Sequence, residues 1–97
     1  MVTDGLLKEF KERMNIFHDG EDSKLKNLLS YSIVYVKNTC GDFDTAKNND
    51  LDKRAVELVL ERTRYAYNDA LEYFEPNFRS EIFALGVEMA GAQDVEE

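Results

Sequence analysis

The sequence is poor in several residue types, and each shortage excludes a class of protein or site. Its 97 residues include one cysteine and one histidine, so an internal disulfide is impossible and a zinc site has too few of its usual ligands. No apolar run approaches the roughly 18 residues that a membrane-spanning helix needs. The first residues do not resemble a signal peptide, so we expect synthesis in the cytoplasm and no membrane partner.

Basic residues are scarce in the last third of the chain. The net charge is −8, and residues 69–97 contribute most of it, with eight acidic residues against a single base, Arg79. Binding to DNA phosphates requires clusters of Lys and Arg, so the composition excludes a general DNA-binding protein. The simplest interpretation of residues 92–97 is an acidic, disordered tail that keeps the protein soluble.

The sequence does have a helical spacing of apolar residues. We expect a first helix over about residues 4–15 and a second over about 22–39. The second stripe is the clearest, with apolar or small residues at three- and four-residue steps: Leu25, Leu28, Leu29, Ser32, Ile33, Val36 and Cys40. No alternation typical of strands occurs, and a chain this short forms one core. The sequence therefore predicts an all-α, compact bundle of about four helices in a single domain over residues 1–91.

The third helix is expected to be the longest, running from residue 50 or 51 to about Phe74. Pro76 has no backbone N–H and disfavours helical geometry at Glu75, so we expect the helix to end there. A short fourth helix is expected to fold back on the core through four apolar residues: Phe78, Ile82, Phe83 and Leu85.

One segment has part of a calcium-loop pattern. Asp42 and Asp44 have the spacing that opens such a loop. The loop also needs an acid or amide at its fifth position, a glycine at its sixth and a glutamate at its twelfth. Those positions hold Ala46, Lys47 and Lys53, so the pattern excludes calcium binding.

Catalytic patterns are also missing. A nucleophile such as Cys40 would need a general base, and His18, the single histidine, lies in a helix-capping turn. The chain has no glycine-rich phosphate loop. We therefore expect a protein that is not an enzyme and that has no cofactor.

The most informative segment is residues 61–74, which are richer in aromatic and arginine residues than a solvated helix face requires. Such groups are enriched in protein interfaces. On one helix they would form a polar and aromatic ridge, which is a candidate subunit interface: Arg62, Arg64, Tyr65, Asn68, Asp69 and Tyr73. The alternative is that the tyrosines belong to the core and only their hydroxyl groups reach solvent.

These residues also carry a family resemblance. The run Arg64-Tyr-Ala-Tyr-Asn-Asp-Ala-Leu-Glu-Tyr-Phe74, together with Cys40-Gly-Asp-Phe-Asp44 and Asn77-Phe-Arg-Ser-Glu-Ile82, resembles the small head–tail connector proteins of tailed phages that infect Gram-positive bacteria. The resemblance covers roughly residues 6–86, and the run that begins at Arg64 is its most specific part.

The resemblance implies a helical adaptor for virion assembly and head completion. Such a protein forms a homo-oligomeric, dodecamer-like ring beneath the portal protein after DNA packaging. It extends the DNA channel without binding DNA specifically, and it docks the next connector, stopper or tail protein. The expected location is the head–tail junction of the virion, and the family offers no catalytic residue or cofactor.

Two roles compete for the acidic residues near the C-terminus, Glu81, Glu88 and Asp94. If they face the channel, their charge keeps DNA sliding through the ring rather than adhering to it. The C-terminal segment of the family is also a portal-docking element. The sequence does not choose between these roles.

A different class of function stays open. A small acidic helical protein can mimic DNA and act as a regulator or inhibitor that occupies the basic groove of a nucleic-acid enzyme. Such mimicry needs acidic residues along one exposed face, whereas the middle helices here mix Lys and Arg with the acids. A helical interaction module of a bacterial complex is a third possibility.

Overall fold

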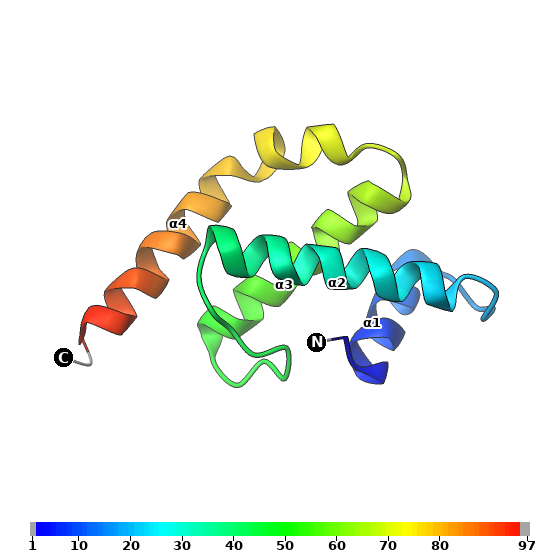
Figure 1. Cartoon of the computed structure of the whole chain (residues 1–97), viewed down its shortest axis with the longest axis horizontal. Coiled ribbons are helices and arrows are strands. Elements are labelled where there is room, and N and C mark those ends of the chain that lie inside the picture. Colours follow the sequence, from blue (N-terminus) through cyan, green and yellow to red (C-terminus); the bar gives the residue numbers. More distant parts are fainter. Residues whose placement is uncertain (1, 96–97) are drawn as a thin grey trace.

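The structure is a computed structural model that describes residues 2–95, with side chains described as far as Ala92. Its elements are α1 (Asp4–Met14), α2 (Asp22–Thr39), α3 (Asp50–Tyr67), a short 3₁₀ helix η1 (Leu71–Tyr73) and α4 (Phe74–Val95). No strand occurs in this part of the chain, so the predicted all-α class is confirmed. The molecule is elongated and flat, with extents of 47 × 27 × 17 Å (Figure 1).

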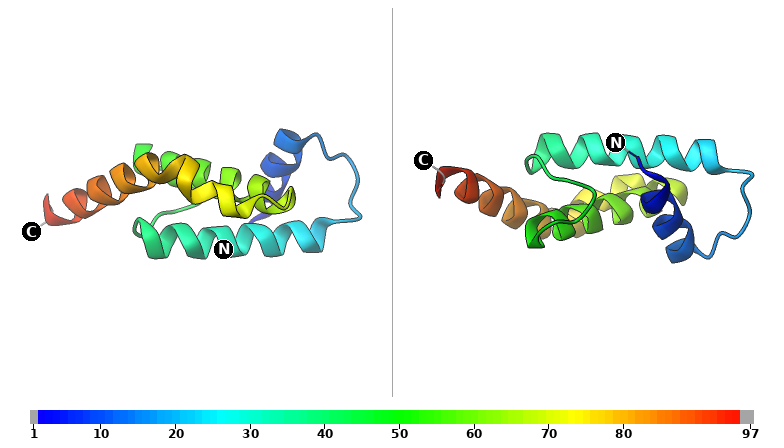
Figure 2. Two further views of the ribbon diagram at one scale, coloured as in Figure 1. Left: turned by 90° about the horizontal axis from the view of Figure 1, so that it is seen from above. Right: turned by 90° about the horizontal axis from the view of Figure 1, so that it is seen from below.

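The helices form two layers. Figure 2 shows α2 as one layer and α3 with α4 as the other, while α1 closes one end. The predicted stripe of α2 is buried except for Leu28, which is partly exposed. Leu25, Leu29 and Val59 are completely inaccessible to solvent. Phe10 of α1 and Phe74 of α4 are also buried, and they pack against Tyr67 and Tyr65 in the last turn of α3.

The loop between α2 and α3 is held by a buried carboxylate. Asp52 is 7% exposed and accepts hydrogen bonds from the backbone N–H groups of Asp44 and Asn48, both at 3.1 Å. Asn49 caps α3 by accepting a bond of 2.8 Å from the Asp52 N–H. The carboxylates of this loop thus accept hydrogen bonds from its backbone N–H groups and so fix the conformation of the loop.

The third helix ends earlier than predicted, so its expected end at Pro76 is wrong. It stops at Tyr67, and Asp69 takes a left-handed conformation with φ of 57°. The Ala70 N–H then donates to the Tyr65 carbonyl at 2.8 Å, which closes the turn. Asn and Asp tolerate this conformation better than most residues, so the Asn68-Asp69 pair is compatible with the turn that ends α3.

Pro76 begins a helix instead of ending one. It is the third residue of α4, inside the first turn, where backbone N–H groups have no partner within the helix. A proline there loses no hydrogen bond and supplies a suitable φ angle.

The fourth helix is long rather than short. It has 22 residues and continues through Gly86 and Gly91 to Val95. Of the expected tail, residues 92–95 are the last turn of α4, and residues 96 and 97 lie outside the described part of the chain. Across the described residues, no helix has the length and apolar character needed to cross a membrane.

Candidate subunit interface

The predicted ridge does not lie on one helix, because it spans the junction between α3 and α4. Tyr65 points toward α4, where its ring packs edge-on against Phe74 and Phe78, each at a centroid distance of 5.8 Å. Its hydroxyl oxygen accepts a hydrogen bond of 3.0 Å from the Asn77 side chain. Tyr65 therefore attaches α4 to α3 and is only partly available to a partner.

Arg62 points toward α2. Its guanidinium lies 4.6 Å from the centre of the Tyr35 ring and donates a hydrogen bond of 3.2 Å to Ser32 Oγ. Burial lowers the pKa of the Arg62 guanidinium, although an arginine stays charged at neutral pH. Because cation–π contact and hydrogen bonding to α2 both occupy this group, Arg62 stabilises the packing of α2 on α3.

Arg64 is part of a surface ion-pair network. It donates to Glu61 at 2.7 Å, and Glu61 also accepts from Arg13 of α1 at 2.8 Å. Arg13 makes a two-pronged contact with Glu57 as well, at 2.9 Å for each bond. An acidic residue on a neighbouring subunit would have to compete with Glu61 for Arg64.

The remaining three residues of the predicted ridge face solvent. Asn68 and Asp69 form the exposed turn after α3. Tyr73, on η1, is 58% exposed. The structure therefore leaves Asn68, Asp69 and Tyr73 free for a contact, and it uses Arg62, Tyr65 and Arg64 largely within the chain.

The acidic candidates on α4 also differ from one another. Glu88 forms an ion pair with Arg54 of α3 at 2.8 Å. Glu81 is exposed and lines a small hollow with Leu58 and Phe78. The side chain of Asp94 lies outside the described part of the chain. Of the two described acids, only Glu81 forms no ion pair with another described residue.

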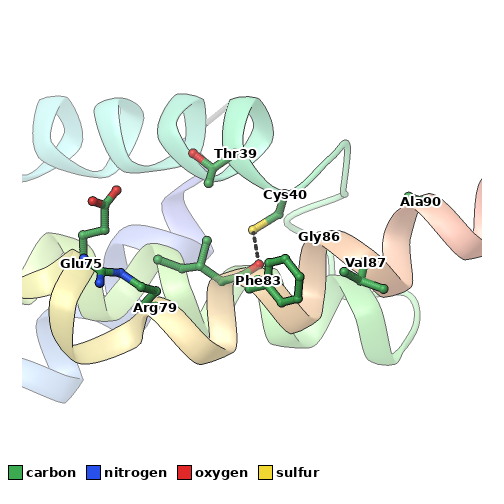
Figure 3. A pocket seen from close by; sticks show the side chains of 9 residues that line it. Thr39, Cys40, Glu75, Arg79, Phe83, Gly86, Val87 and Ala90 are labelled. Atoms are coloured by element: carbon green, nitrogen blue, oxygen red, sulfur yellow. Dashed lines mark hydrogen bonds between the residues drawn. The ribbon is translucent and has the colours of Figure 1, made fainter.

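Sequence reasoning missed a groove between the end of α2 and the outer face of α4. We call it the α2–α4 groove; it has a volume of about 540 Å³ and its lining includes Thr39, Cys40, Phe83, Gly86 and Val87. Figure 3 shows Thr39 and Cys40 above and the α4 residues below. Phe83 is 72% exposed and Val87 is 54% exposed, so the groove has an apolar wall that faces solvent.

The signal for this groove is present in the sequence. Phe83 and Val87 are four residues apart, so they share one helix face. The buried stripe of α4 follows a different face, through Ile82, Leu85 and Met89. A helix with two apolar faces can be covered on two sides, and the expectation that Phe83 joins the core concealed the second face.

At the opposite end of the molecule from the α2–α4 groove, a single apolar side chain is exposed. Phe17, in the loop between α1 and α2, is 84% exposed. It borders a shallow hollow whose apolar residues are Leu7 and Ile16.

The single cysteine and the single histidine both form hydrogen bonds within the chain. Cys40 donates its thiol hydrogen to the Ile82 carbonyl at 3.5 Å, and burial raises the pKa of this thiol, which keeps it in the weakly reactive protonated form. His18 accepts a hydrogen bond from the Gly20 N–H. Among the described residues, no group of three or more His, Cys, Asp or Glu side chains is arranged to hold a metal ion.

Comparison with known proteins gives no match for this chain among family models, curated proteins or solved structures. The interpretation of function therefore depends on the residues themselves and on the sequence resemblance.

Proposed function

We propose that this protein is a structural connector at the head–tail junction of a tailed phage. In this role it forms a homo-oligomeric ring under the portal protein, extends the DNA channel and docks the next connector, stopper or tail component. It works without a cofactor and catalyses no reaction.

The observation that carries the proposal is that exposed apolar side chains lie at both ends of so small a domain. Phe83 and Val87 form the wall of the α2–α4 groove, and Phe17 lies far from them in the loop after α1. Exposed apolar surface of this kind marks contact sites, because covering it removes apolar area from water. A subunit of a ring needs at least two such surfaces, one for each neighbour.

The sequence resemblance supplies the rest of the proposal. It covers about residues 6–86, and its most specific run, from Arg64 to Phe74, forms the junction between α3 and α4. Tyr65 and Phe74 pack together there, so this run supports the architecture of the subunit. The proposed docking functions belong to the exposed surfaces around it.

The acidic inhibitor is less well supported, because many acids are paired within the chain. Glu57 and Glu61 accept from Arg13, and Glu88 pairs with Arg54. A DNA mimic would present such carboxylates to a basic partner without neutralising them first.

The test is co-sedimentation of the purified protein with DNA-filled capsids that carry a portal but no tail, followed by imaging of the portal vertex. The proposal predicts a ring of added density at that single vertex. Capsids that have already received a connector serve as the control, and they should bind no further protein. A folded protein that does not bind the tailless capsids would refute the proposal.

A further inference from the structure

We propose that the loop carrying Phe17 docks in the α2–α4 groove of a second copy of the chain. The inference rests on the proposed ring and identifies the two surfaces that join its subunits. We call residues 15–21, between α1 and α2, the Phe17 loop.

The two surfaces lie at opposite ends of an elongated molecule. In Figure 1 the Phe17 loop forms the right-hand end, whereas the end of α2 and the second half of α4 lie at the left. The long axis measures 47 Å, so one copy cannot bring its own loop to its own groove. A contact between two different surfaces at opposite ends joins copies head to tail, and a ring results when the rotation per copy closes.

The Phe17 loop holds an exposed aromatic ring in a position where a neighbouring copy can bury it. Phe17 is almost fully exposed, and an isolated aromatic side chain in water gains free energy when a neighbour covers it. The loop is anchored at both of its ends. At one end, Ile16 N–H donates to the Lys11 carbonyl at 2.9 Å. At the other, Lys11 Nζ bonds Asp19 at 3.0 Å and Asp22 at 2.8 Å. A preorganised loop loses little conformational entropy on docking.

The groove offers a mainly apolar surface, with the charged residues Glu75 and Arg79 at one end (Figure 3). Phe83 and Val87 form one wall, and Thr39 and Cys40 at the end of α2 form the other (Figure 3). Gly86 lies between these walls and approaches the backbone of α2, because a Cβ atom there would lie 3.7 Å from the Thr39 carbonyl oxygen. A side chain larger than that of glycine at this position would extend toward α2, so Gly86 leaves room in the groove for an aromatic ring.

Charge favours this arrangement over a symmetric contact between two α4 helices. In the described part of α4, the acids Glu75, Glu81 and Glu88 outnumber the single base Arg79, so pairing two α4 helices would place like charges together. The hollow beside Phe17 is balanced, with Lys8, Lys11 and Lys26 against Asp4, Glu12 and Asp22. Its Lys8 and Lys26 form no ion pair with the described acids. They can therefore approach a neighbour's acidic helix.

The first experiment is disulfide trapping between copies. The Cys40→Ser background removes the native thiol, and Phe17→Cys with Val87→Cys places one exposed cysteine on each surface. Under a mild oxidant, at concentrations where the protein self-associates or on tailless capsids, we expect a ladder of covalent oligomers. The matched control carries Phe17→Cys with Val34→Cys, because Val34 is also 53% exposed but does not line the groove. We expect at least about tenfold less cross-linking in the control, because a random encounter has no effective-concentration advantage.

The second experiment measures affinity. Phe17→Ser should weaken self-association by about 10- to 100-fold, because docking would no longer bury a large apolar side chain. Val34→Ser should leave it unchanged. Circular dichroism of both variants should match the parent protein, because neither residue belongs to the core.

The outcomes separate the inference from the proposed function. If the protein assembles at the portal vertex but the two pairs cross-link equally and Phe17→Ser associates normally, the docking contact is wrong and the connector role stands. If the folded parent protein assembles neither in solution nor on capsids, both are refuted.

Discussion

Tyr65 provides the sharpest test of whether the run from Arg64 to Phe74 supports the fold or forms an interface. Tyr65 packs edge-on against Phe74 and Phe78 at 5.8 Å, and each such aromatic pair contributes about 0.5–1.5 kcal/mol beyond its buried area. A fully buried aromatic residue costs about 3–5 kcal/mol when changed to alanine. Since Tyr65 is half-buried, we expect Tyr65→Ala to lower the free energy of unfolding by roughly 2–3 kcal/mol.

The assay is urea unfolding followed by circular dichroism at 222 nm, with Tyr65→Phe as the matched control. The phenylalanine keeps both ring contacts and loses only the exposed hydrogen bond to Asn77, so its cost should stay below about 0.5 kcal/mol. Asp69→Ala, added to Tyr65→Ala, tests the original interface hypothesis directly. The reasoning fails if Tyr65→Ala keeps the stability of the parent protein while self-association is lost, since Tyr65 would then act in the interface and not in the fold.

Three further predictions concern the loop after α2 and the contact between α1 and α3. Asp52→Ala should lower the free energy of unfolding by about 1–3 kcal/mol, because two partly buried backbone N–H groups lose a charged acceptor; chemical denaturation checks this, and a cost under about 0.5 kcal/mol would contradict it. Gly41→Ala should cost about 1–3 kcal/mol in the same assay, because φ is 138° and the new Cβ would lie 3.1 Å from Met89 Sδ; an unchanged unfolding midpoint would be inconsistent with that strain. Arg13 holds the pKa of Glu57 below its usual 4.5, so the pair stabilises the fold above pH 4.5 and this contribution disappears as the pH falls through the lowered pKa. Because Glu57 is largely exposed, the effect should stay below about 1 kcal/mol; Glu57→Gln should remove that part of the acid sensitivity in a pH series, and an identical pH profile would exclude the pair as its source.

Much of the fold follows directly from the sequence. The stripe of α2 predicts a buried face, and Leu25, Leu29, Ile33 and Val36 are indeed buried. These positions were predictable because helical periodicity reports which face meets the core regardless of which partner covers it. The bounds predicted for the second helix, residues 22 and 39, are those of α2.

The junction between α3 and α4 was not predicted, because local signals compete there. Pro76 is compatible with the first turn of one helix as well as with the end of another. The Asn68-Asp69 turn breaks the helix only if tertiary contacts favour it, and the packing of Tyr65 on Phe74 and Phe78 provides those contacts. A pattern of apolar residues cannot report such a preference.

The candidate interface was harder to predict than the fold for a related reason. The spacing along α3 shows that Tyr65 and Arg62 lie outside its main apolar stripe. It does not show that α4 packs on Tyr65 and that α2 packs on Arg62. Conversely, Phe83 reads as a core residue until the direction of α4 is known. Exposure depends on contacts between distant segments, and a local pattern does not contain them.

The outer part of α4 has a consequence for how the protein behaves as salt is added. Between Phe83 and Ala92 its only charged residue is Glu88, and Glu88 is already paired with Arg54. Mutual repulsion between copies with a net charge of −8 therefore acts over a distance, while attraction through the apolar wall acts only on contact. Salt shortens the range of repulsion to about 8 Å at physiological ionic strength and leaves the apolar attraction in place. Association that grows with ionic strength would therefore show that contact through this wall outweighs the attraction of Lys8 and Lys26 to a neighbour's acids, which salt weakens.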